Sequence, residues 1–84
     1  MIGQFVYSTA GHDKGTLYVV VAEDQQYVYL ADGRLRQPST PKKKKRKHIQ
    51  PVLKTVEEPL LTQLRGGQLP QPEQLRRAIR LYEE

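Results

Sequence analysis

The first third of the chain alternates short apolar runs with polar turns. Residues 2–8, 16–22 and 27–31 are rich in β-branched and aromatic side chains, which favour strands. Glycine, acidic and amide residues separate the three runs, as is typical of turns. The run 16–22 is almost continuously apolar, so we expect it to form a central strand that is buried on both faces.

A tight hairpin is predicted after the third run. Asp32 and Gly33 form the pair favoured in two-residue hairpin turns, because glycine accepts a positive φ without a steric clash. The next three residues alternate polar, apolar and polar. This pattern predicts a short strand with Leu35 inward and both Arg34 and Arg36 outward.

The strands together indicate a small barrel. After a loop at residues 38–41 and a basic run, Ile49 is the expected inward anchor of a final short strand that closes the sheet. Five short strands in about 50 residues, with no helical pattern between them, favour a closed β-barrel over a parallel α/β sheet. We therefore expect a mainly β fold with a barrel over residues 1–54.

A helical extension is predicted over residues 55–84. Thr55 and Glu58 have the spacing of a capping box, although Pro59 offers a second possible start for the first helix. Gly66 and Gly67 end that helix.

The second helix is predicted to begin at Pro72, and it carries an apolar stripe of Leu75, Ala78, Ile79 and Tyr82. Two helices this short are not stable alone. They must dock on each other, on the barrel or on a partner.

Composition narrows the possible functions. The 84 residues include no cysteine and only two histidines, which excludes disulfides, zinc knuckles and thiol chemistry. The sequence has no run of about 18 apolar residues, which a membrane-spanning helix would need. Its first residues do not have the pattern of a signal peptide. We expect a cytoplasmic, non-enzymatic protein with no cofactor, metal ion, membrane or small-molecule substrate.

The positive charge is concentrated in one segment. The net charge is +5, and nine of the 14 Lys and Arg residues lie between Arg34 and Lys54, where there is no Asp or Glu. Phosphates are the natural counter-charge for such a run, although a solvated loop and a nuclear localisation signal have the same pattern. The candidate RNA contacts are Lys14, Arg34, Arg36, Lys42, Lys43, Lys44, Lys45, Arg46, Lys47 and His48.

A second candidate site is the turn formed by Gly11, His12, Asp13, Lys14 and Gly15. Two glycines allow close approach of the backbone to a phosphate, but the same residues also suit a plain β-turn. The spacing is not that of a Walker loop. Neighbouring Ser8 does not complete a hydrolytic triad, because no oxyanion hole or pocket is apparent.

Several segments resemble a known family: the first two of those below resemble the KOW motif, and the later three resemble the middle segment of small KOW-domain proteins. They are residues 3–15 (Gly-Gln-Phe-Val-Tyr-Ser-Thr-Ala-Gly-His-Asp-Lys-Gly), residues 19–21 (Val-Val-Val), residues 31–36 (Ala-Asp-Gly-Arg-Leu-Arg), residues 41–45 (Pro-Lys-Lys-Lys-Lys) and residues 47–51 (Lys-His-Ile-Gln-Pro). Together they resemble the small bacterial KOW-domain RNA-binding proteins, which are similar to KOW-bearing large-subunit ribosomal proteins of archaea and eukaryotes. The resemblance implies an SH3-like barrel whose glycine turn and basic loop face RNA. His12 departs from the Arg or Lys common there, which leaves Lys14 as the expected phosphate contact at the turn.

The expected function is therefore binding of structured RNA, with ribosomal RNA as the foremost partner, in a ribosome-associated or ribosomal-protein-like role. One alternative is a protein-interaction adaptor of the transcription or translation machinery, which would use the barrel and the C-terminal helices to bind a ribosomal or transcription protein. A nuclear DNA-binding protein is a third interpretation.

Overall fold

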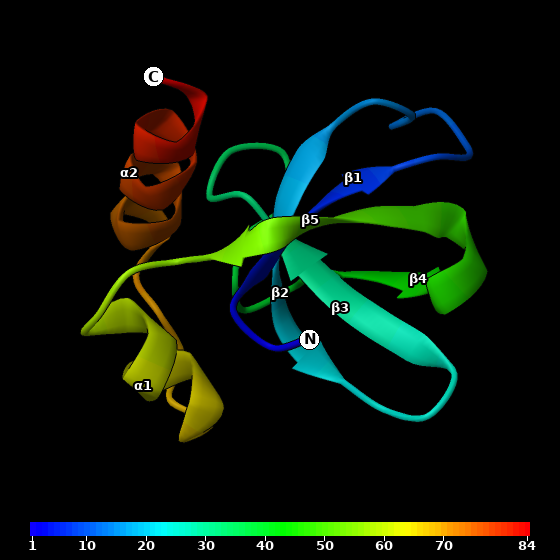
Figure 1. Cartoon of the computed structure of the whole chain (residues 1–84). Helices are drawn as coiled ribbons and strands as arrows, with labels where there is room; N and C mark the ends of the chain where they lie inside the picture. The colour runs from blue at the N-terminus through cyan, green and yellow to red at the C-terminus, as the bar shows by residue number, and fades with distance from the viewer.

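The computed structural model describes all of residues 1–84 as one curved antiparallel sheet with two helices beside it (Figure 1). The five strands lie in the order β4-β3-β2-β1-β5. They are β1 (Gln4–Ser8), β2 (Leu17–Glu23), β3 (Tyr27–Ala31), β4 (Lys42–Lys45) and β5 (Ile49–Thr55). A one-turn 3-10 helix, η1 (Arg46–His48), joins the two edge strands.

The sheet is not closed into a barrel by backbone pairing. β4 pairs only with β3, and β5 pairs only with β1, so the two edge strands do not hydrogen-bond to each other as a ladder. Ile49 at the start of β5 is buried as expected. The predicted number of five strands is confirmed, but one strand lies elsewhere than predicted, and the sheet is not closed into a barrel.

Both faces of the sheet carry an apolar cluster. The alternation of side chains along the central strand β2 sends Leu17 and Val19 to one face and Tyr18 and Val20 to the other. All four are buried, which confirms the expected two-sided burial of this strand. Ile49 joins the second cluster, on the face away from the helices.

The helices cover the first face. In α2 (Pro72–Glu83) Leu75 is fully buried in the same cluster as Phe5, and the ring of Tyr82 stacks on the ring of Phe5 with centroids 4.7 Å apart. The predicted apolar stripe of α2 therefore packs on the sheet, and it is not left free for a partner. Neither helix has the length and apolar character needed to cross a lipid bilayer.

The helix boundaries follow one of the two predicted alternatives. α1 (Leu60–Arg65) begins after Pro59, and Thr55 ends β5 instead of capping the helix. The carboxylate of Glu58 accepts hydrogen bonds from the backbone N–H and the hydroxyl of Thr62. It thus pairs one of the N–H groups that the first turn of a helix leaves without a partner. α2 begins at Pro72, as predicted.

The predicted fourth strand is wrong. Residues 34–36 form a turn, because the Asp32 carboxylate accepts the N–H groups of Arg34 at 2.9 Å and of Arg36 at 3.0 Å. The backbone N–H groups of Asp32 and Gly33 both donate to the Arg36 carbonyl oxygen and close the turn. Leu35 points outward and is 71% exposed. Arg76 of α2 donates to the Gly33 carbonyl oxygen at 2.6 Å and fixes this loop against the helix. The fourth strand is instead β4, which lies inside the basic run.

We expect Leu75→Ala to lower the free energy of unfolding by about 2–5 kcal/mol, because it leaves a cavity between α2 and the sheet. Leu81→Ala in the same helix is the matched control, since Leu81 is 45% exposed. Urea denaturation followed by circular dichroism measures both values. Equal effects of the two substitutions would show that α2 does not share the core of the sheet.

Candidate nucleic-acid interface

The basic run separates into inward and outward residues because it forms a strand. In β4, Lys44 lies opposite Val28 of β3 and is only 8% exposed, whereas Lys43 and Lys45 are exposed. The alternation continues through η1, where Arg46 is half-buried and Lys47 is exposed. Lys42 at the start of β4 is also half-buried.

The buried ammonium group of Lys44 is fully engaged inside the protein. It donates to Asp13 Oδ1 at 2.6 Å, to Ser8 Oγ at 2.6 Å and to the carbonyl oxygen of Ala10 at 2.8 Å. An ammonium group has three N–H donors, so no donor remains for a phosphate. Lys44 therefore links β4 to the end of β1 and to the glycine turn, and it lies inside the protein, apart from the exposed lysines of the basic run.

The carboxylate of Asp13, the partner of Lys44, accepts three hydrogen bonds. Besides the bond from Lys44, it accepts hydrogen bonds from the hydroxyls of Tyr18 and Ser8, both at 2.9 Å. Burial raises the pKa of Asp13, but the hydrogen bonds from Lys44, Tyr18 and Ser8 together outweigh it and lower the pKa to about 2. Burial and the bond to Asp13 raise the pKa of Tyr18. The carboxylate holds the glycine turn and does not face solvent.

The remaining residues of the glycine turn lie at the surface. Gly11, His12, Lys14 and Gly15 are exposed, and both glycines have a positive φ near 85–89°. His12 makes no hydrogen bond to Ser8 or to Asp13, so these three residues form no catalytic triad. The turn can present Lys14 and backbone N–H groups to a ligand.

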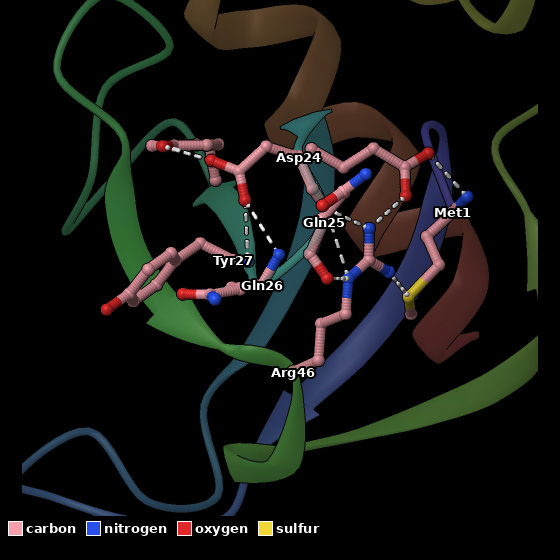
Figure 2. Close-up of polar contacts among 8 residues, drawn as sticks. Met1, Asp24, Gln25, Gln26, Tyr27 and Arg46 are labelled. Atoms are coloured by element: carbon pink, nitrogen blue, oxygen red, sulfur yellow. Dashed lines mark hydrogen bonds and ion pairs between the residues drawn. The ribbon is translucent and has the colours of Figure 1, made fainter.

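Arg46 has a second internal role (Figure 2). Its guanidinium donates to Glu23 Oε1 at 2.7 Å and, through Nε, to the carbonyl oxygens of Asp24 and Gln25, each at 3.2 Å. The N-terminal ammonium of Met1 binds the other oxygen of Glu23 at 2.8 Å. Hydrogen bonds from Met1 and Arg46 lower the pKa of Glu23 to about 2. Arg46 thus anchors the turn between β2 and β3 and is not a free RNA contact.

Asp24 fixes the same turn from within. Its Oδ1 accepts the backbone N–H groups of Gln26 at 2.9 Å and Tyr27 at 2.8 Å, and its Oδ2 accepts the hydroxyl of Tyr29 at 3.0 Å. The backbone hydrogen bonds from Tyr27 and Gln26 lower the pKa of Asp24. The turn therefore holds one conformation before any ligand binds.

An aromatic and basic surface lies on the outer side of β3 and β4. Tyr27 is directly opposite Lys45, and Tyr29 is directly opposite Lys43. The Lys43 ammonium also lies 4.2 Å from the centre of the Tyr27 ring, which is a cation–π contact. We call these four residues the Tyr–Lys face. A shallow depression beside it is lined by Gln25, Gln26, Tyr27, Lys45, Arg46 and Lys47.

The other predicted contacts do not all join this face. Arg34 and Arg36 are exposed, but their loop follows the end of β3, at the opposite end of the β3–β4 hairpin from Lys45. His48 is half-buried in η1, and its carbonyl oxygen accepts the N–H of Thr9 at 2.9 Å. The predicted basic contacts are thus divided between the two ends of the hairpin.

Gln25, Gln26 and Tyr27 were not among the predicted site residues. Two tyrosines at alternate positions of one strand, paired with a lysine-rich strand, were the available signal. These tyrosines could be placed beside the lysines only if the lysine run was itself assigned to a strand.

Elsewhere, a hollow of about 270 Å³ lies between the end of β5 and α2, among residues that include Phe5, Lys54, Arg77 and Tyr82. None of residues 42–47 lines it. No three His, Asp or Glu side chains lie together in a way that would hold a metal ion.

The chain matches no protein-family model and no curated protein. Its function is therefore inferred from its residues and their arrangement.

Acid should weaken the link between Lys44 and Asp13. The folded-state pKa of Asp13 is lowered from 3.8 to about 2, so the unfolded chain takes up this proton first as the pH falls. The stabilisation is complete above pH 3.8 and is lost as the pH falls toward 2. We expect Asp13→Asn to be less stable at pH 7, by about 3 kcal/mol, and to lose less further stability between pH 4 and pH 2.

Urea unfolding at several pH values measures both effects. Glu57→Gln is the control, because Glu57 is exposed and takes part in none of the ion pairs. An acid-induced decline that is as steep in Asp13→Asn as in the unsubstituted protein would contradict this role of Asp13.

Proposed function

We propose that this protein binds structured RNA, as a non-enzymatic, ribosome-associated or ribosomal-protein-like factor of the cytoplasm. The observation that carries the proposal is a set of exposed lysines that take part in none of the protein's ion pairs. The four ion pairs of the protein use Met1, Lys44, Arg46 and Arg76 as the cations. None of them uses Lys43, Lys45 or Lys47, which remain free to bind phosphates.

The spacing of these lysines suits a phosphate backbone. Lys43 and Lys45 are two residues apart on the same face of β4, which separates them by about 6.6 Å along the strand. Lys47 continues the exposed series in η1. Each ammonium group can therefore contact a different phosphate, and release of counterions from the RNA would drive binding.

Folded RNA is the partner that best suits this surface. The glycine turn is held by Lys44 and the β2–β3 turn is held by Arg46, so the loops beside the lysines are ordered before binding. A preformed surface loses little conformational entropy on binding and favours a partner with a defined shape. Lys14 adds a further exposed cation on the glycine turn.

We also propose that the sheet is an SH3-like barrel of the KOW type. Two features support it: the strand order, with the last two strands at opposite edges, and the single 3-10 turn that joins them. The hydrogen bonds from the buried Lys44 ammonium to Ser8 and Ala10, which link the edge strand β4 to the end of β1, also support this proposal.

The adaptor alternative is less favoured, because it relied on the apolar stripe of α2. That stripe is occupied by the sheet, with Leu75 fully buried. The alternative that the protein binds duplex DNA is tested by the binding experiment described next.

The direct test is the triple variant Lys43→Gln, Lys45→Gln and Lys47→Gln. We expect it to abolish co-sedimentation with ribosomes and to reduce the steepness of log affinity against log salt for structured RNA by about 2–3, because three phosphate contacts are lost. The matched control replaces Lys54, Arg65 and Arg77 with Gln, which removes the same charge from the helical side, where all three are exposed.

The control should keep ribosome binding. Equal loss in both triple variants would show that only total charge matters. Unchanged sedimentation of the first variant would contradict the proposal, and stronger binding to duplex DNA of matched length would favour the DNA-binding alternative.

A further inference from the structure

We propose that Tyr27 stacks on one unpaired base of the bound RNA, that Gln25 and Gln26 contact the edge of that base, and that Lys45 and Lys47 bind the flanking phosphates. This inference rests on the proposed RNA-binding function and names the kind of RNA involved. The expected target is a folded RNA that presents an unpaired nucleotide, such as a bulge, a loop or an end.

The ring of Tyr27 is placed for such a contact. Tyr27 lies on the outer side of β3 and lines the shallow depression beside Lys45 and Lys47. Its hydroxyl makes no hydrogen bond within the protein, whereas the hydroxyl of Tyr29 is bound by Asp24. The Lys43 ammonium lies over one face of the Tyr27 ring, so a base would stack on the opposite face, with this positive charge across the ring from it.

Two amide side chains border the same depression. Gln25 and Gln26 are exposed, and neither side chain makes a hydrogen bond within the protein. Each amide offers two N–H donors and one carbonyl acceptor, which is the set needed to pair with a base edge. Figure 2 shows the Gln26 side chain and the Tyr27 ring extending together from the turn, away from Met1.

The turn that carries these residues is held in advance. Asp24 binds the N–H groups of Gln26 and Tyr27, and Arg46 binds the carbonyl oxygens of Asp24 and Gln25. Arg46 is therefore a positioning residue, which acts through the turn and does not touch the RNA. A rigid aromatic platform keeps more of its stacking free energy than a mobile one.

The arrangement selects an unpaired base within a folded RNA. Bases inside a double helix are covered on both faces by their neighbours, so a protein side chain cannot stack on them. Tyr27 is the one aromatic residue that lines the depression beside Lys45 and Lys47, which fits one exposed base next to a helix. A long single strand would be expected to meet several successive aromatic residues.

The test compares two RNA hairpins that differ only by a single bulged nucleotide, made as 2-aminopurine. We expect the unsubstituted protein to bind the bulged hairpin about tenfold more tightly and to quench the 2-aminopurine fluorescence by stacking. Tyr27→Phe keeps the ring and should retain both effects. Tyr27→Ala and Tyr27→Leu should bind both hairpins equally and should leave the fluorescence unquenched.

Tyr27→Leu keeps an apolar side chain in the strand and is therefore the milder of the two substitutions. Circular dichroism of both variants shows whether a loss of preference for the bulged hairpin comes from unfolding. Equal binding of both hairpins by the unsubstituted protein, with no quenching, would overturn the stacking inference and leave RNA binding intact. Binding to neither hairpin and to no ribosome would overturn the proposed function, and the stacking inference with it.

Discussion

The buried ion pair between Lys44 and Asp13 is the constraint on which the rest of the structure depends. It joins β4 to the glycine turn across 31 residues of sequence, and both charged groups are largely removed from water, with 8% and 13% of their side chains exposed. A buried charge without a partner costs several kcal/mol, so the pair forces Lys44 to face inward. Once Lys44 faces inward, the alternation of a strand requires Lys43 and Lys45 to face outward.

The basic run therefore has two roles that alternate along the chain. Lys44 and Arg46 hold the glycine turn and the β2–β3 turn, and the residues between and after them carry the exposed charge. A surface built in this way is both charged and ordered. To the RNA that we propose as its partner, this surface presents exposed ammonium groups for the phosphates together with a fixed aromatic ring, a combination that a flexible lysine tail lacks.

The pattern of apolar residues predicted the strands and the helix whose side chains repeat with the period of the element. It failed where a residue distant in the sequence sets the direction of a side chain. The strands around residues 2–8, 16–22 and 27–31 and the helix at Pro72 were found, because their side chains repeat with the period of the element. A run of lysines has no such period, so β4 was missed. The inward position of Lys44 depends on Asp13, and the outward position of Leu35 depends on hydrogen bonds to Asp32. The sequence located the basic segment of the candidate site but not the surface to which it belongs, because Tyr27 lies beside these lysines only through the pairing of β3 with β4.

The most direct measurement compares the free energies of unfolding of Lys44→Met and Lys43→Met. The two substitutions make the same chemical change at adjacent positions of one strand. The account predicts that Lys44→Met lowers the free energy of unfolding by about 3 kcal/mol, because Asp13 is left buried without its counter-charge. Lys43→Met should change it by less than about 0.5 kcal/mol, as is usual for an exposed residue. Equal effects at the two positions would contradict the inward placement of Lys44 and the surface derived from it.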